Sequence, residues 1–229
     1  MKQIALDIGL ASGPTLRNYF SGPNEAALRH LELWVGSPAS GGATRSPVPT
    51  YLWGSQGCGK THLLKAVHDA VLEQGASTGW LDASTAQPPE FNEDWSVLLM
   101  DDVHLYSAVQ QQAAFNWFVN AQTHQRGLLA AGCLPPADLP LREDLRSRLG
   151  WGHVFELHLL TEAERRAVLR QAADSRGVFL GDEVMDFMLT RFSRDLGSLM
   201  ELLELIDGYA LQSKRAVTIP LIKAMMEDA

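Results

Sequence analysis

Eight consecutive residues have the composition and spacing of a phosphate-binding loop. They are Gly54-Ser55-Gln56-Gly57-Cys58-Gly59-Lys60-Thr61, and they match the pattern G-x-x-x-x-G-K-[ST]. Glycines at these positions let backbone N–H groups curl around an anion, while the helix that follows points its positive end at the same place. The pattern predicts that Lys60 reaches the β- and γ-phosphates and that Thr61 ligates Mg²⁺. A chance glycine-rich turn is the weaker interpretation, because all four fixed positions match.

Two adjacent acids follow a buried apolar segment, Val97-Leu98-Leu99-Met100. In a parallel sheet the carboxyl ends of the strands gather around the phosphate loop. We therefore expect Asp101 to hold Mg²⁺ through water and Asp102 to orient a hydrolytic water. The alternative is that both acids simply begin a solvated loop.

A short basic helix is predicted over residues 142–149, before a Gly-Trp-Gly turn at 150–152. Arg142 and Arg146 are expected to extend along the surface or to pair with neighbouring acids. Arg148 differs, since it stands at the end of the helix next to the compact turn. From there its guanidinium can reach a phosphate of another molecule.

The first residues alternate between polar and apolar types. Gln3, Ile4, Leu6 and Ile8 suit an extended peptide that docks into a hydrophobic pocket. An ordinary tail or an edge strand is the competing interpretation, because six residues carry little information.

The elements that must position these residues alternate along the chain. Asn24 is expected to cap a helix over 25–34. Strands are predicted at 50–53, 78–83, 96–100, 128–131 and 154–157, with helices at 60–74 and 108–123. Only helices are predicted further on, at 162–176, 182–192, 195–211 and after 218, the first opening with the capping box Thr161-x-x-Glu164. The fold class is therefore α/β, a parallel sheet with helices on both faces plus a small C-terminal all-α domain. We assign a tail to 1–14, the α/β domain to 15–158 and the helical domain to 159–229.

Composition narrows the classes of function. The 229 residues include 19 Lys and Arg against 27 Asp and Glu, so the net charge of 19 − 27 = −8 argues against coating nucleic acid as the main work. Two cysteines make no disulfide scaffold and point to a reducing cytoplasm, where Cys58 and Cys133 are expected to serve as small packing residues. No apolar run approaches the roughly 18 residues of a membrane span, and no secretory leader is visible.

Taken together, the loop, the acids and the segments at 147–152 and 159–229 resemble the AAA+ module of the bacterial replication initiator DnaA. Residues 15–24 resemble the segment with which that family covers the nucleotide base, which adds Tyr19 to the expected nucleotide contacts. The sequence reads to Ala229 without a helix-turn-helix pattern after the helical segment, so we expect no DNA-binding domain of that kind. With its Gln-Ile-x-Leu-x-Ile tail it is similar to the Hda family, regulatory inactivators of DnaA.

The resemblance implies that the tail binds the sliding clamp and that Arg148 is an arginine finger offered to ATP on DnaA. Stimulated hydrolysis would prevent re-initiation. The resemblance places the protein in the cytoplasm and, through the clamp, on the nucleoid. It would reach DNA mainly indirectly, by way of the clamp. Hydrolysis of the nucleotide that this protein itself binds is expected to be weak, because Cys133 and Gly197 stand where the family places sensor residues. The sequence does not decide whether ADP or ATP is the working ligand, or whether the protein forms homo-oligomers. The alternatives are a stand-alone AAA+ ATPase such as a helicase loader, and a DNA-binding initiator paralogue.

Overall fold

A computed structural model describes residues 13–36, 45–192 and 196–227 of the protein. The chain divides into two compact units, one spanning Gly13–Leu159 and one that begins at Leu160. The predicted clamp-binding residues Gln3, Ile4, Leu6 and Ile8 lie outside the described part.

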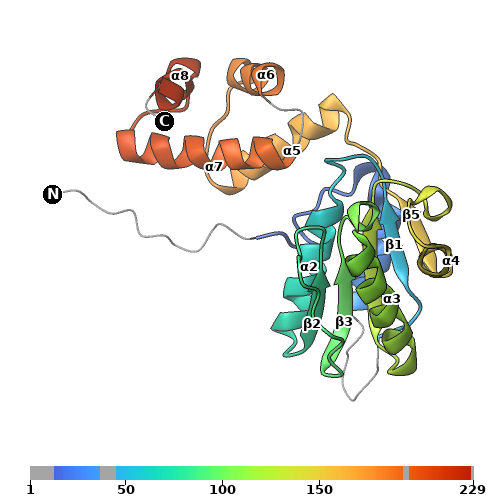
Figure 1. Ribbon diagram of the computed structural model, residues 1–229. Helices are drawn as coiled ribbons and strands as arrows, with labels where there is room; N and C mark the ends of the chain where they lie inside the picture. Colours follow the sequence, from blue (N-terminus) through green and yellow to red (C-terminus); the bar gives the residue numbers. More distant parts are fainter. Residues whose placement is uncertain (1–12, 37–44, 193–195, 228–229) are drawn as a thin grey trace. The chain divides into compact units, whose positions relative to one another are not determined.

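The first unit is built on a five-stranded parallel sheet (Figure 1). The strands lie in the order β2-β3-β4-β1-β5, and every pair of neighbours runs parallel. Because all strands share one direction, the loops after β1, β2 and β3 leave the same edge of the sheet. Their bounds are β1 (Thr50–Trp53), β2 (Ser77–Leu81), β3 (Trp95–Met100), β4 (Gly127–Gly132) and β5 (His153–Glu156).

Helices cover both faces of this sheet, as the alternation of elements predicts. In β3, Leu98 and Met100 pack into a core with α3 and α4, whereas Val97 and Leu99 pack with α1 and α2. Side chains of a strand point alternately to opposite faces, so a continuous apolar segment becomes buried on both sides. The helices of this unit are α1 (Glu25–Val35), α2 (Lys60–Glu73), α3 (Ala108–Thr123) and α4 (Glu143–Leu149), with 3-10 turns η1 (Gly22–Asn24), η2 (Val103–Leu105) and η3 (Pro136–Asp138).

The second unit is all helical in its described part. Its first helix begins with the predicted capping box: the Thr161 hydroxyl accepts from Glu164 N, and the Glu164 carboxylate accepts from Thr161 N. Met185, Met188 and Leu203 are fully buried and belong to the hydrophobic core of this unit. The helices are α5 (Glu162–Ser175), α6 (Asp182–Arg191), α7 (Leu196–Ser213) and α8 (Ile219–Glu227). None of the described helices is long and apolar enough to cross a membrane.

The predicted end of the second strand was wrong. β2 stops at Leu81 instead of continuing to residue 83, because the Asp82 carboxylate accepts from the backbone N–H of Ser84 and from the hydroxyls of Ser84 and Thr85. A side chain that bonds the backbone two residues on turns the chain and ends the ladder.

Candidate functional site

The phosphate loop follows β1, and its glycines have backbone conformations that other residues rarely adopt. Gly59 has φ = 94°, and a Cβ there would lie 2.6 Å from the Tyr19 ring. At Gly54 a Cβ would lie 2.2 Å from the Leu157 carbonyl oxygen. Real Cβ atoms do not approach that closely, so only glycine lets the loop curl against β5 and Tyr19.

Lys60 begins α2 and is buried, with 5% of the residue's surface exposed. Its Nζ donates to the carbonyl oxygens of Gly54 at 2.7 Å and Ser55 at 2.9 Å, and lies 3.6 Å from the Cys58 Sγ. A buried ammonium needs such partners, because desolvation of an unpaired charge is costly. The loop therefore holds a fixed positive charge at the N-terminus of a helix, which is an arrangement that attracts anions.

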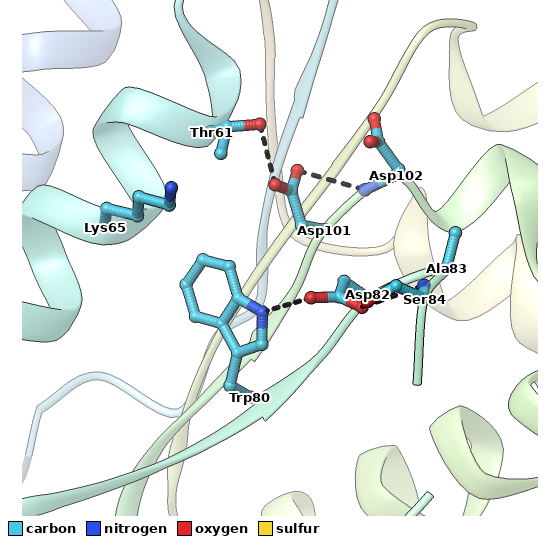
Figure 2. Close-up of a pocket in the computed structure, with 8 residues that line it drawn as sticks. All are labelled: Thr61, Lys65, Trp80, Asp82, Ala83, Ser84, Asp101 and Asp102. Atoms are coloured by element: carbon cyan, nitrogen blue, oxygen red, sulfur yellow. Dashed lines mark hydrogen bonds between the residues drawn. The ribbon is translucent and has the colours of Figure 1, made fainter. Parts of the chain in front are cut away.

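The fold brings the two predicted metal ligands together from positions 40 residues apart. The Thr61 hydroxyl donates to Asp101 Oδ2 at 2.7 Å, and Asp102 N donates to Asp101 Oδ1 at 3.0 Å. Figure 2 shows the Asp101 carboxylate facing Thr61. Burial raises the pKa of Asp101, and the bond from Thr61 opposes that rise. Asp102 has φ = 48°, a left-handed conformation that aspartate tolerates, and its side chain is half-buried.

A pocket of about 410 Å³ opens beside this pair (Figure 2). Trp80 and Asp82 line it from the end of β2, and the sequence analysis had not singled them out. The Trp80 indole N–H donates to Asp82 Oδ2 at 2.9 Å. Burial opposes ionisation of Asp82, but hydrogen bonds from Ser84, Trp80 and Thr85 outweigh it and lower the pKa of Asp82. An acid near the carboxyl end of a predicted strand is the sequence feature that could have found it, since Asp82 falls within the strand predicted at 78–83 and directly after the observed β2. The lining residues are Thr61, Lys65, Trp80, Asp82, Ala83, Ser84, Asp101 and Asp102.

The donor set of this pocket fits Mg²⁺. Hydroxyl and carboxylate oxygens are the ligands that this ion prefers, and it takes one or two carboxylates together with substrate phosphates. Within the described ranges, no three His, Cys, Asp or Glu side chains gather around one point to enclose a metal. An open pair such as Thr61 and Asp101 therefore suits an ion shared with a nucleotide, not a closed structural site.

On the other side of the loop, a buried asparagine connects three segments. Asn24 Nδ2 donates to the Tyr19 hydroxyl at 3.1 Å and to the His158 carbonyl at 3.0 Å, and its Oδ1 accepts from His158 N at 2.7 Å. The Tyr19 hydroxyl donates to the Cys58 carbonyl at 3.1 Å. Burial raises the pKa of Tyr19 to about 12, so the phenol stays protonated and able to donate. The predicted capping role of Asn24 was wrong, because its side chain makes no capping bond and holds the end of β5 instead.

Arg148 lies in the last turn of α4, half-buried against α3. Its guanidinium carbon is 5.1 Å from the centre of the Phe115 ring and 5.6 Å from that of Phe118. Among the described residues its side chain makes no hydrogen bond or ion pair. Arg142, by contrast, pairs with Asp144 at 2.6 Å, which confirms the surface pairing expected for it. Arg148 is thus oriented by aromatic faces while its N–H donors stay available.

The topology separates Arg148 from the phosphate loop of its own chain. The turn after Arg148 enters β5 where the strands begin, since His153 N donates to the Pro49 carbonyl at 2.9 Å and His153 pairs with Thr50. The phosphate loop leaves β1 after Trp53, at the opposite edge. The Arg148 end of α4 and the phosphate loop of the same chain therefore lie at opposite edges of the sheet.

Both cysteines of the protein are free thiols. β4 lies beside β1, which is the neighbourhood that a pairing of Cys58 with Cys133 requires, yet no disulfide joins them. Cys58 is part of the buried core of the α1 and α2 face, and burial raises the pKa of its thiol. Its place in the core agrees with a packing role.

Replacing Asp101 by Asn is expected to raise the free energy of unfolding at pH 7 to 8 while weakening Mg²⁺-nucleotide binding. An acid whose pKa is raised on folding destabilises the folded state wherever it is ionised, and this cost fades as pH falls through that pKa. Asn can keep both bonds, because its amide can donate to Thr61 and its oxygen can accept from Asp102 N.

Denaturant titrations of both proteins across pH check this. The advantage of Asp101→Asn should shrink toward acid pH, and Asp69→Asn, at an exposed position of α2, should show no such advantage. A variant that is less stable than the wild type at pH 8 would contradict the expectation.

Fold and site together define an AAA+ module: a parallel sheet with a phosphate loop after β1, acids after β3 and a following helical unit. Domain III of DnaA from Thermotoga maritima has this fold, with a TM-score of 0.72, 20% identity and coverage of 93% of this chain and 95% of that one. AMPPCP-bound DnaA from Aquifex aeolicus matches with a TM-score of 0.67 and 21% identity, over 94% of this chain and 70% of that one.

Comparison of the sequence with known proteins adds two findings to the comparison of folds. A family model described as the lid domain of Hda matches residues 162–226. An uncharacterised protein of Haemophilus influenzae is 31% identical over 234 residues, covering 98% of both chains. The protein belongs to the Hda-like family of DnaA-related AAA+ proteins.

Proposed function

We propose that this protein regulates replication initiation by docking on the sliding clamp and stimulating hydrolysis of the ATP that DnaA holds, so that initiation is not repeated. The observation that supports the proposal is the environment of the Arg148 side chain. Its guanidinium is oriented on Phe115 and Phe118, has no anionic partner in the described structure and lies away from its own phosphate loop. An arginine placed on transition-state charge is worth roughly 10³ to 10⁵ in rate for nucleotide hydrolases.

The chain's own nucleotide, ADP or ATP, has a regulatory role in this proposal. A relative of the same fold is described as AMPPCP-bound, and the loop here offers the same kind of cradle. Lys60 would exchange its bonds to the Gly54 and Ser55 carbonyls for phosphate oxygens, and Tyr19 would lie on the base side. Thr61 and Asp101 would hold Mg²⁺, which when bound neutralises phosphate charge.

A second candidate, a stand-alone ATPase, is favoured by one observation. Thr61 and Asp101 are already joined, and Asp102 follows directly at the same edge. Sustained phosphate release by the purified chain alone, lost in Asp102→Ala, supports that candidate against the regulator. The regulator predicts slow release by the chain alone and fast release only with ATP-loaded DnaA.

The clamp part of the proposal is tested at the tail. Hydrolysis of DnaA-bound ATP is measured with and without this protein and with clamp loaded on DNA. Replacing Gln3 and Leu6 by Ala is expected to reduce stimulation to the level seen without clamp, because in this proposal the two side chains would fill the hydrophobic pocket that receives an extended peptide. Asp7→Ala, in the same peptide, should keep full stimulation. Full clamp-dependent stimulation by the double variant contradicts the docking role.

A further inference from the structure

A hollow of about 450 Å³ lies beside Arg148, and an exposed tryptophan forms part of its wall. The lining residues are Gln122, Ser147, Arg148 and Trp151. Trp151 keeps 64% of its surface exposed, although tryptophan offers a large apolar area that water solvates poorly. Exposed tryptophans beside a hollow are typical of residues that carry binding energy at protein interfaces.

The position of Trp151 is held by the backbone. Trp151 N donates to the Arg148 carbonyl at 3.2 Å. A Cβ on Gly152 would lie 2.0 Å from the Pro49 carbonyl oxygen, so the turn passes that residue at the closest approach that glycine permits. Across the hollow, Gln122 Nε2 donates to the Pro47 carbonyl at 2.8 Å. The backbone that carries Trp151 and the side chain of Gln122 are thus already held in place, which lowers part of the entropic cost of docking.

The charge of this surface indicates its occupant. Arg148 brings a guanidinium to the hollow without an anionic partner among the described side chains, and Arg142 has its charge matched by Asp144. A complementary partner carries negative charge next to an apolar contact. The phosphate-bearing edge of a nucleotide-loaded AAA+ module carries such negative charge.

We propose that Trp151 anchors the nucleotide-loaded partner beside Arg148, so that Trp151 sets the affinity of the encounter and Arg148 sets its rate. This inference rests on the proposed function. An aromatic next to an arginine can also stack on bases of single-stranded nucleic acid, but the net charge of −8 opposes that partner.

The test titrates the protein against ATP-loaded DnaA in the presence of DNA-loaded clamp and separates the half-saturating concentration from the maximal rate. Trp151→Ala is expected to raise the half-saturating concentration about tenfold or more, as truncation of an interface anchor does, while the maximal rate is retained. Trp151→Phe should recover part of the affinity. Leu33→Ala, on α1, removes an apolar side chain that is 68% exposed and should titrate like the wild type.

The outcomes separate the two proposals. If the wild-type protein stimulates hydrolysis but Trp151→Ala and Trp151→Phe titrate like it, the anchor is wrong and the proposed function stands. The anchor is also wrong if Trp151→Ala lowers the maximal rate and leaves the half-saturating concentration unchanged. It is likewise wrong if Trp151→Ala weakens binding of single-stranded DNA by the chain alone as much as it weakens the interaction with DnaA. If the wild-type protein gives no stimulation, the proposed function fails and the anchor with it. Thermal unfolding of each variant, expected within a few degrees of wild type, excludes misfolding as the cause.

Discussion

Arg148→Ala is expected to reduce the stimulated hydrolysis of DnaA-bound ATP by about 10³-fold or more, to the rate without this protein. The guanidinium has no ion pair to lose in the described structure, and its contacts are the faces of Phe115 and Phe118. Its removal therefore costs the fold little while it removes the charge that would stabilise the transition state. Single-turnover release of phosphate from ATP-loaded DnaA measures the effect.

Two further substitutions make this prediction specific. Arg142→Ala removes a neighbouring guanidinium that is already paired with Asp144 and should leave stimulation nearly unchanged. Arg148→Lys keeps the charge but loses the planar set of donors, so most of the stimulation should still disappear. Binding of nucleotide to the protein's own loop should survive all three changes. Retained stimulation by Arg148→Ala would remove the central support of the proposed function.

Lys60→Ala is expected to weaken binding of ADP or ATP by about 100-fold. Hydrogen bonds to charged groups contribute about 1.5 to 3 kcal/mol each, and each 1.4 kcal/mol is a factor of ten in affinity. On binding, Lys60 would gain two hydrogen bonds to phosphate oxygens and lose its bonds to the Gly54 and Ser55 carbonyl oxygens. Its net contribution to the free energy of nucleotide binding is therefore about 3 kcal/mol. Calorimetric titration with each nucleotide, with and without Mg²⁺, measures it.

The matched control for Lys60 removes the same charge elsewhere. Lys223→Ala, at an exposed position of α8, should bind nucleotide as the wild type does. Because Lys60 is buried, its loss also frees two loop carbonyls, so a small drop in melting temperature is expected. Dissociation constants of Lys60→Ala within threefold of wild type would mean that the loop does not bind phosphate through this side chain.

Local patterns in the sequence were enough to predict the elements and the class. Residues 97–100 of β3 are buried on both faces and are continuously apolar, and a capping box needs only residues three apart. The loop and acids could be placed at one edge of the sheet because parallel strands end together. All of these depend on neighbours in sequence or on a rule that holds for every parallel sheet.

Asn24 shows where such reasoning stops. As a residue before a helix it has the chemistry of a cap, yet its partner is His158, 134 residues away. The same amide can satisfy either bond, and only the approach of β5 to the N-terminal segment decides between them. Trp80 and Asp82 are a second example, because they line the pocket only as a result of the position of β2 at the edge of the sheet.

The sequence by itself determined which residues could do chemistry: the phosphate loop, the acid pair and a distinctive arginine. The tertiary structure decided which of them meet. It joins Thr61 to Asp101, and it puts Arg148 and Trp151 on a surface away from the loop. The physical reason is that local pattern reports preferences of the backbone, whereas a contact between distant residues depends on the order of strands and on packing that no short segment encodes.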